Sequence, residues 1–231
     1  MEEPLHNIIQ VQEQIAQAAR RSGRDPADIT LIGVTKSVPV DKIEKAILAG
    51  IKHIGENRVQ EAKSKYEAVG RKVKWHLIGH LQRNKVKQAI VIFDFIHSLD
   101  RLSLAREIQK QAAKQDINIS CLVQVNVAGE ESKFGLAPEE LLPFVRQVAG
   151  FPNLTIRGLM TIAPYTKDPE EVRPVFRRLR ELFTQPGYPP EAKMEYLSMG
   201  MSNDYTVAIE EGANMVRLGT KIFGSRNTIE E

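Results

Sequence analysis

The feature of this sequence that most constrains its fold is an alternation of two kinds of segment, which runs from about residue 30 to the end of the chain. Short apolar runs rich in β-branched residues alternate with longer stretches in which apolar residues recur at helical spacing, the pattern of repeated βα units. Leu102, Ala105 and Ile108 mark one such helical face. Eight segments are candidate strands: Thr30–Thr35, His53–Glu56, Lys74–Gly79, Phe93–Ser98, Ser120–Asn126, Thr155–Ile162, Glu195–Met199 and Met215–Leu218.

Eight βα units in a chain of 231 residues predict an α/β fold, a single (β/α)8 barrel of the TIM type. Each parallel strand needs a crossover helix, and closure of the sheet leaves no exposed edge. The amphipathic stretch Leu5–Arg21 precedes the first strand, so we expect an extra N-terminal helix outside the barrel. No linker rich in Pro, Gly or Ser divides the chain, which predicts one domain over residues 1–231. An open doubly wound sheet is less favoured, because Val34–Ser37 stands where its Gly-x-Gly-x-x-Gly turn would follow the first strand.

Composition is that of a soluble globular protein, with 42% hydrophobic and 26% charged residues. The single cysteine, Cys121, cannot form an internal disulfide, and we expect it to be a buried thiol in a cytoplasmic protein. Neither a signal peptide nor an apolar run of the ~18 residues that a membrane span needs is visible, so no membrane partner is expected. The net charge of +3 is small, and acidic residues interleave with the basic face around Arg177, so no nucleic-acid partner is expected.

Polar residues gather where the candidate strands end, which is the face on which barrels of this kind carry their functional groups. The last two strands are followed by glycines and hydroxyls, and loops at these two positions commonly bind phosphate through backbone N–H groups. The alternative interpretation is that these residues are ordinary turn glycines and helix caps. The residues concerned are Ser198, Gly200, Ser202, Gly219, Thr220 and Gly224.

Lys36 follows the apolar run of the first strand and so lies at the rim of the barrel interior. A lysine partly removed from water there would have a lowered pKa, and its neutral amine could attack a carbonyl carbon. The alternative is a lysine that extends into solvent. A reactive amine facing a phosphate site indicates a ligand with both an aldehyde and a phosphate, such as pyridoxal 5'-phosphate (PLP). Arg217 would then face the pyridine nitrogen and keep it unprotonated, unless it forms an ion pair with Glu56 or Glu210.

At this point the motifs resemble those of the YggS/PROSC family of pyridoxal phosphate homeostasis proteins, and the resemblance covers nearly the whole chain. It implies a PLP-binding barrel of the kind that forms the N-terminal half of alanine racemase (fold type III) without the second β domain, holding PLP as an aldimine on Lys36. It further implies that Arg217 faces the pyridine nitrogen, that Asn57 and His80 lie near the ring, and that Ser198, Met199, Gly219 and Thr220 line the phosphate. The motifs are Val34–Lys36, Ile54–Glu61, Trp75–Lys85, Gln124–Asn126, Lys133–Leu136, Gly158–Met160, Leu197–Asp204 and Val216–Thr220.

Family members are regarded as carriers or regulators, so the resemblance implies intracellular PLP (vitamin B6) homeostasis, with PLP and other B6 vitamers as ligands. Apo forms of PLP-dependent enzymes are the implied recipients, with effects on amino-acid pools, and we expect a monomer. We predict no catalytic residue. The alternatives are an amino-acid racemase that uses Lys36 with Tyr165 or Tyr205 as a second acid/base group, and a class I aldolase-like enzyme in which Lys36 forms a Schiff base with a sugar phosphate.

Two histidines, His76 and His80, are four residues apart, a spacing that would suit metal ligands on a helix. On a strand the same spacing separates them by ~13 Å, too far for one ion. We therefore predict no metal site.

Overall fold

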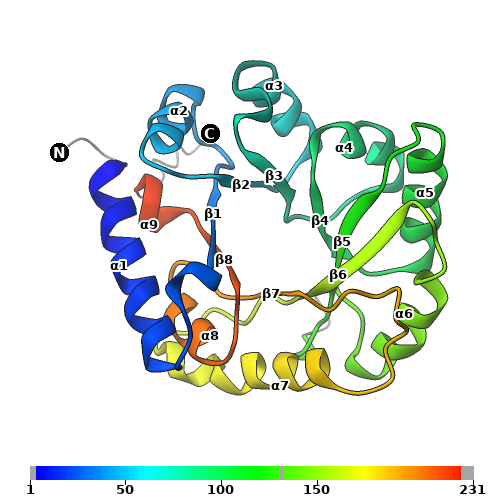
Figure 1. Ribbon diagram of the computed structural model, residues 1–231. Helices are drawn as coiled ribbons and strands as arrows, with labels where there is room; N and C mark the ends of the chain where they lie inside the picture. Colours follow the sequence, from blue (N-terminus) through cyan, green and yellow to red (C-terminus); the bar gives the residue numbers. More distant parts are fainter. Residues whose placement is uncertain (1–3, 131–132, 225–231) are drawn as a thin grey trace.

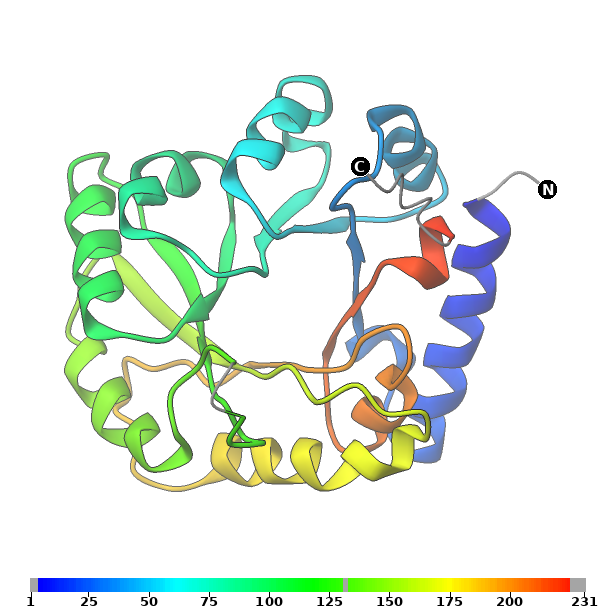
Figure 2. The same cartoon turned by 180° about the vertical axis from the view of Figure 1, so that it is seen from behind.

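The computed structural model describes residues 4–130 and 133–224. Its centre is a closed barrel of eight parallel strands in sequence order, with β1 paired to both β2 and β8. Figures 1 and 2 look along the barrel from its two ends. The predicted (β/α)8 barrel is thereby confirmed. The strands are β1 Thr30–Val34, β2 His53–Glu56, β3 Lys74–Leu77, β4 Phe95–Leu99, β5 Ile119–Gln124, β6 Leu154–Met160, β7 Tyr196–Ser198 and β8 Met215–Leu218.

Helices surround the barrel, and the first of them precedes the strands as predicted. This helix, α1 (Leu5–Arg21), packs against the last two helices, α8 and α9, on the outside of the barrel (Figure 1). Asn7 donates to the carbonyl of Ile222 at 3.0 Å, which ties α1 to α9. The other helices are α2 Val40–Leu48, α3 Val59–Val69, α4 Val86–Ile92, α5 Leu102–Ala113, α6 Leu141–Val148, α7 Arg173–Thr184, α8 Tyr205–Glu210 and α9 Thr220–Phe223. Single turns of 3-10 helix lie at Pro26–Asp28, Gly70–Lys72, Arg83–Lys85, Pro138–Glu140 and Pro169–Val172.

All eight strands lie where the sequence predicts them, with differences of one or two residues at the ends. The difference at β4 has a clear cause. Phe93, predicted as its first residue, instead ends α4 by donating its backbone N–H to Ala89 at 2.9 Å. The apolar run there serves the end of a helix as well as a strand, and composition does not separate the two.

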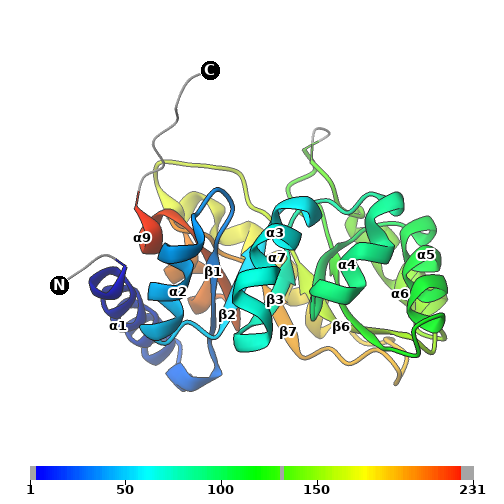
Figure 3. The ribbon, with the colours of Figure 1, turned by 90° about the horizontal axis from the view of Figure 1, so that it is seen from above.

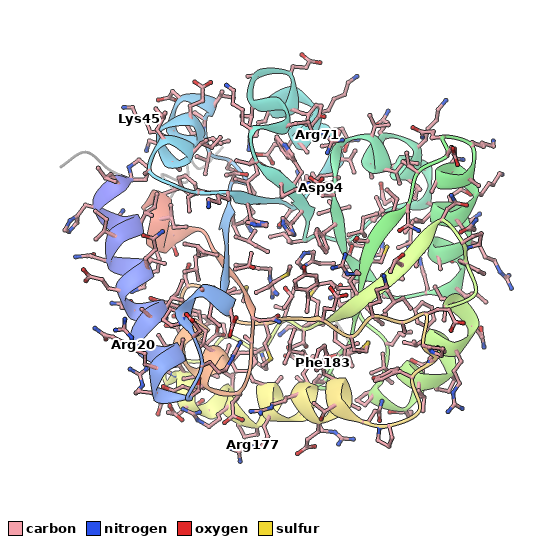
Figure 4. The ribbon with its side chains drawn as sticks, in the orientation of Figure 1. Arg20, Lys45, Arg71, Asp94, Arg177 and Phe183 are labelled. Atoms are coloured by element: carbon pink, nitrogen blue, oxygen red, sulfur yellow. The ribbon has the colours of Figure 1, made fainter. Side chains whose placement is uncertain are left out.

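The barrel encloses a small apolar core that is distinct from the larger one between strands and helices. Ile32, Leu122, Met160 and Met215 form this inner core and are almost completely buried. Each such side chain contributes about 1.5–3 kcal/mol through burial. Figure 4 shows side chains filling the space that the strands enclose. The barrel is therefore packed through its middle, and room for a ligand must be sought at its ends.

The inward-facing residues are not all apolar. His76, His97, Ser198 and Arg217 are buried inside the barrel, towards the carboxyl ends of the strands. The loops after β1 and β6 rise above these strand ends on the upper side of Figure 3. Among the helices of the described residues, none is long and apolar enough to cross a bilayer.

Candidate functional site

A cavity of about 630 Å³ opens at the carboxyl ends of the strands, within the size range of small-molecule sites. It brings together most of the residues that the sequence predicts to bind PLP. Ser198 and Met199 do not line it, because both side chains are fully buried behind its wall. The predicted residues that line the cavity are Lys36, Asn57, His80, Ser202, Arg217, Gly219 and Thr220.

Lys36 is half-buried and enters the cavity from a tight turn after β1. Within this turn the backbone N–H of Val38 donates to Thr35 at 3.0 Å. Ser37 has φ 58°, a left-handed conformation that is uncommon for residues other than glycine. The turn therefore needs support from its surroundings to hold Lys36 in place.

That support comes from a network of three charged side chains and one threonine, which we call the Lys65 cluster: Lys65, Glu56, Glu61 and Thr35. Lys65 Nζ donates to Glu56 at 2.8 Å, to Glu61 at 2.6 Å and to the carbonyl oxygen of Thr35 at 2.6 Å. The Thr35 hydroxyl donates to Glu56 Oε1 at 2.6 Å. The backbone N–H of Ser37 donates to Glu61 at 2.5 Å. One ammonium thus fixes both sides of the turn that carries Lys36.

The two carboxylates of the Lys65 cluster respond differently to their surroundings. Burial raises the pKa of Glu56 above its ordinary value, although hydrogen bonds from Lys65 and Thr35 oppose the shift. Burial also pushes the pKa of Glu61 upward, but hydrogen bonds from Lys65 and Ser37 outweigh it, so that this pKa ends below its ordinary value. Of the two carboxylates, Glu56 is the less well stabilised in its charged form, because it is completely buried and its Oε2 has no hydrogen-bond partner among the described residues.

Asn57 and His80 form the next part of the wall, after β2 and β3. Gly79 lets these two segments meet, since a Cβ there would lie 2.8 Å from the Asn57 Cα. The His80 ring stacks on Phe134 with ring centroids 4.0 Å apart. Burial, and then the nearby charge of Arg101, lowers the pKa of His80. A neutral imidazole on an aromatic face therefore borders the cavity.

Arg217 reaches the cavity from β8 and is 3% exposed. Its guanidinium donates to the Ser198 hydroxyl at 2.6 Å and to the carbonyl oxygen of Thr161 at 2.8 Å. Burial lowers its pKa to about 10, against the opposing charge of Asp204. The alternative of an ion pair with Glu56 or Glu210 is wrong.

Those two carboxylates are engaged elsewhere: Glu56 pairs with Lys65, and Glu210 pairs with Arg21 and Arg173. Within the part of the chain that the structure describes, Arg217 donates two of its five N–H groups to protein atoms, and its other N–H groups can serve a ligand.

The loops after β7 and β8 close the remaining side of the cavity. The Ser202 hydroxyl accepts the backbone N–H of Gly219 at 3.3 Å, which joins the two loops. Gly200 has φ 94°, and a Cβ there would lie 2.9 Å from the Cα of Tyr205, so only glycine suits this bend. Among the charged residues that line the cavity, the cations Lys36, Arg217 and Lys221 outnumber the single carboxylate, Asp204. This balance favours an anionic ligand.

Behind Arg217 lies a row of imidazoles that sequence reasoning missed as a unit. His53 Nδ1 lies 2.9 Å from His76 Nε2, and His76 Nδ1 lies 2.9 Å from His97 Nε2. His97 Nδ1 lies 3.0 Å from the Ser198 hydroxyl, which accepts from Arg217. We call His53, His76, His97 and Ser198 the histidine chain. The sequence holds one sign of this row, because three of the five histidines lie on consecutive strands. The strand register that aligns their rings cannot be read from the sequence.

The two tyrosines considered as second acid/base groups lie in different surroundings. Tyr205 is 3% exposed, does not line the cavity, and donates its hydroxyl to Gln14 of α1. Tyr165 borders the cavity but is 84% exposed. Neither is held over the cavity by a hydrogen bond, among those recorded for the described residues, that would place its hydroxyl as a proton donor.

Other residues that the sequence analysis considered have the following surroundings. Cys121 is buried, and burial raises the pKa of its thiol. Arg177, which projects from α7 away from the barrel in Figure 4, pairs with Glu211 at 3.0 Å, in keeping with an ion-paired surface rather than a basic patch. Within residues 4–130 and 133–224, no group of three or more His, Cys, Asp or Glu side chains could hold a metal ion.

Comparison with known proteins identifies the family. The family model described as alanine racemase, N-terminal domain, matches residues 7–227. A pyridoxal phosphate homeostasis protein of Aquifex aeolicus is 48% identical over 220 residues, 95% of this chain and 96% of that protein.

Two solved structures share the fold at similar length. A crystal structure of an unknown protein from Bifidobacterium adolescentis has 33% identity and a TM-score of 0.88, covering 95% of this chain and 94% of that one. PipY of Synechococcus elongatus, solved with PLP bound, has 36% identity and a TM-score of 0.79, covering 91% of this chain and 100% of that one. This chain therefore belongs to the alanine racemase N-terminal domain family and, as its motifs predict, to the pyridoxal phosphate homeostasis proteins within it.

Proposed function

We propose that this protein binds PLP in the cavity at the carboxyl ends of the strands and acts in intracellular vitamin B6 homeostasis as a carrier that supplies PLP to apo-enzymes. The observation that carries the proposal is the meeting of Lys36 and Arg217 in one cavity with the loops after β7 and β8. An amine, a buried guanidinium and a phosphate-binding type of loop suit the aldehyde, the ring nitrogen and the phosphate of PLP.

The residues present fit this ligand. Lys36 Nζ would form a C=N bond with the aldehyde carbon, with loss of one water, and the Lys65 cluster would hold the turn that presents the amine. Arg217 retains N–H groups for the ring nitrogen. We assign the phosphate to Ser202, Gly219 and Thr220, where backbone and hydroxyl donors line the cavity.

The remaining predicted residues have less direct roles in this arrangement. Asn57 and His80 would border the ring. Ser198 and Met199 would act from behind the wall, Ser198 through its hydrogen bond to Arg217.

Several features support a carrier over an enzyme. PLP supplies an electron sink when its ring nitrogen is protonated, and a guanidinium partner such as Arg217 keeps that nitrogen unprotonated. Racemisation also needs two acid/base groups on opposite faces of the substrate carbon. Lys36 could be one, but Tyr205 is turned towards α1 and Tyr165 is mostly in solvent. We propose on these grounds that no residue of the cavity is catalytic, and we expect a cytoplasmic monomer.

The first experiment combines a visible absorption spectrum with borohydride reduction and peptide mass mapping. We expect an absorption band of lysine-bound PLP and a reduced pyridoxyl mass on the peptide that contains Lys36. Lys36→Ala should abolish both signals. Lys221→Ala is the matched control, since Lys221 lines the same cavity and should leave the mass on Lys36. A protein that stays colourless with added PLP, and traps a sugar phosphate instead, would favour the aldolase-like alternative.

A second experiment separates the carrier from the racemase. The PLP-loaded protein is mixed with the apo form of a PLP-dependent enzyme, and the recovery of that enzyme's activity is followed over time. We expect recovery faster than with an equal concentration of free PLP. Interconversion of amino-acid enantiomers that is lost in both Lys36→Ala and Tyr165→Phe would contradict the carrier role and support a racemase.

A further inference from the structure

The histidine chain joins the two ends of the barrel. At one end Ser198 is bonded to Arg217, which lines the main cavity. At the other end His53 is the first residue of β2, is half-buried, and borders a second cavity of about 470 Å³ with Gln12 and Lys52. Every link between these ends measures 2.9–3.0 Å. The chain is therefore a continuous hydrogen-bonded path through an otherwise apolar barrel interior.

Each link of this path needs one hydrogen, and a neutral imidazole carries one hydrogen on one nitrogen. In the outward arrangement the Ser198 hydroxyl donates to His97, His97 Nε2–H donates to His76, and His76 Nε2–H donates to His53. In the inward arrangement His53 Nδ1–H donates to His76, and His76 and His97 likewise donate from Nδ1 towards Ser198. Because Arg217 already donates to Ser198, the outward arrangement gives the Ser198 hydroxyl hydrogen an acceptor and satisfies the whole chain.

Only the His53 end of the path is placed to hold a positive charge. Burial, and then the charges of His53 and Lys74, keeps the pKa of His76 well below its ordinary value. Burial, and then the charges of His76 and Arg217, does the same for His97. His76 also stacks on Phe95 with ring centroids 5.0 Å apart, which leaves no room for water on that face.

At His53 burial also lowers the pKa, but the carboxylate of Asp94, labelled in Figure 4, opposes that shift. Lys74 and Lys52 are the other charged groups that act on His53. At the far end of the path, Asp204 is the carboxylate that acts on Arg217. Asp94 is therefore the carboxylate that favours a positive charge at the His53 end of the path.

We propose that the histidine chain is a proton relay between the main cavity and the opposite end of the barrel. Arg217 Nη1 passes the hydrogen that it donates to Ser198 Oγ while the original hydroxyl hydrogen moves to His97 Nδ1, and a proton from the cavity restores the guanidinium. The Nε2 hydrogen of His97 then moves to His76 Nδ1, and that of His76 moves to His53 Nδ1. One O–H and four N–H bonds form, one O–H and three N–H bonds break, and the proton gained appears as charge on His53. Loss of the Nε2 hydrogen of His53 to solvent completes the transfer.

The relay rests on protein atoms alone and holds whether or not PLP is the ligand of the main cavity. The relay predicts that His76 and His97 change tautomer without a change of charge. When His53 becomes protonated, its Nδ1 must donate, so His76 and His97 must both move their hydrogen from Nε2 to Nδ1 while they stay neutral. A set of histidines with a merely structural role would titrate one by one, or not at all.

The test is ¹⁵N NMR of the full chain with ¹⁵N-labelled histidine, without ligand, between pH 8 and pH 5. We expect the two nitrogens of His76 and of His97 to exchange their shifts together, at the same midpoint as the protonation of His53. His6, on the exposed side of α1, supplies the reference signal. Protonation of His53 with unchanged tautomers at His76 and His97 would overturn the relay.

Two variants identify the direction of proton entry. His53→Gln keeps a hydrogen-bonding side chain but cannot take up the charge, so the joint exchange at His76 and His97 should disappear. Ser198→Ala removes the link to the cavity side, so the joint exchange should become slow, and separate signals for the two tautomeric states should replace the averaged ones. His6→Gln is the matched control and should leave the exchange unaltered. An exchange that is as fast in Ser198→Ala as in the wild type would contradict entry from the cavity, and the wild-type titration decides the case if a variant does not fold.

Discussion

The Lys65 cluster and the histidine chain are two buried polar networks beside the same cavity, and they are built differently. The first consists of formal charges: the Lys65 ammonium lies between the carboxylates of Glu56 and Glu61. The second is neutral, since burial keeps His76 and His97 uncharged. Charges fix a geometry, whereas a row of neutral imidazoles can shift its hydrogens without moving a heavy atom. The cluster therefore suits the holding of Lys36, and the chain suits communication with Arg217.

The energetics of the two networks differ in the same sense. Removing one partner of a buried ion pair leaves an uncompensated charge, whereas removing one partner of a neutral hydrogen bond leaves an unsatisfied dipole. The first loss is the larger. Variants of the two networks should therefore rank by charge, since Glu56 in one network and His76 in the other are both completely buried.

The largest effect is expected from Lys65→Met. This change leaves Glu56 completely buried without its cation, and we expect a loss of about 3–5 kcal/mol in the free energy of unfolding, measured by urea denaturation. The double variant Lys65→Met with Glu56→Gln removes both charges and should recover most of the loss. A single variant within about 1 kcal/mol of wild type would mean that the cluster is not held as an ion pair.

A smaller loss is expected from His76→Leu. The change leaves His53 and His97 each without one hydrogen-bond partner inside the barrel, at a cost of about 1–3 kcal/mol in the free energy of unfolding. The same urea titration provides the measurement. If His76→Leu destabilises the protein more than Lys65→Met does, the contrast between the charged and the neutral network is wrong.

The buried histidines and Glu56 should also respond to pH with opposite signs. The folded-state pKa of His76 and of His97 lies below the ordinary 6.5, so their stabilisation is fully present above that pH and is lost as the pH falls. The folded-state pKa of Glu56 lies above the ordinary 4.5, so its contribution is present below that pH and is lost as the pH rises through the folded value.

Between pH 6.5 and pH 5 each buried ring should therefore lower stability by about 1.4 kcal/mol per pH unit. In His76→Leu the free energy of unfolding should fall less steeply with decreasing pH than in the wild type, because the contribution of one buried ring is missing. Urea titrations at several pH values would measure the two slopes. Equal slopes in the variant and the wild type would show that His76 is not held neutral by the fold.

The smallest effect is expected at an exposed ion pair that lies outside both networks and serves as a reference for them. Arg178 and Glu181 lie 2.9 Å apart on α7, and both side chains are more than half exposed. Glu181→Ala should change the free energy of unfolding by less than about 0.5 kcal/mol. A larger change, measured in the same way, would show that burial is not what separates the networks from the surface pairs.

Much of the fold could be predicted because it depends on local patterns. The strands carry short β-branched runs and the helices carry apolar residues at helical spacing, and these patterns persist in the folded chain. Lys36, Arg217 and the glycine-rich loops could be predicted as well, because each stands directly after or within a predicted strand of a barrel that uses this face. The start of β4 could not, since the apolar residues around Phe93 also end α4.

The two polar networks could not be predicted from spacing. Lys65 lies on the buried face of α3 with Ala62 and Val69, and helical spacing does not show that its ammonium pairs there with Glu56 of the preceding strand. Ser198 stands 101 residues from His97 in the sequence but bonds to it across the barrel. No periodicity within one segment contains such a pairing.

The order of amino acids was thus sufficient to locate the secondary structure, to predict barrel closure and to single out Lys36 and Arg217 as residues of a shared site. The secondary structure depends on patterns within single segments. The shared site follows from the rule that the carboxyl ends of all strands of a barrel lie on one face. Strand register and the packing of helix on sheet decided the rest. They alone align His53, His76 and His97 into one path and bury Lys65 between two carboxylates, because contacts between distant segments depend on three-dimensional geometry that local spacing does not encode.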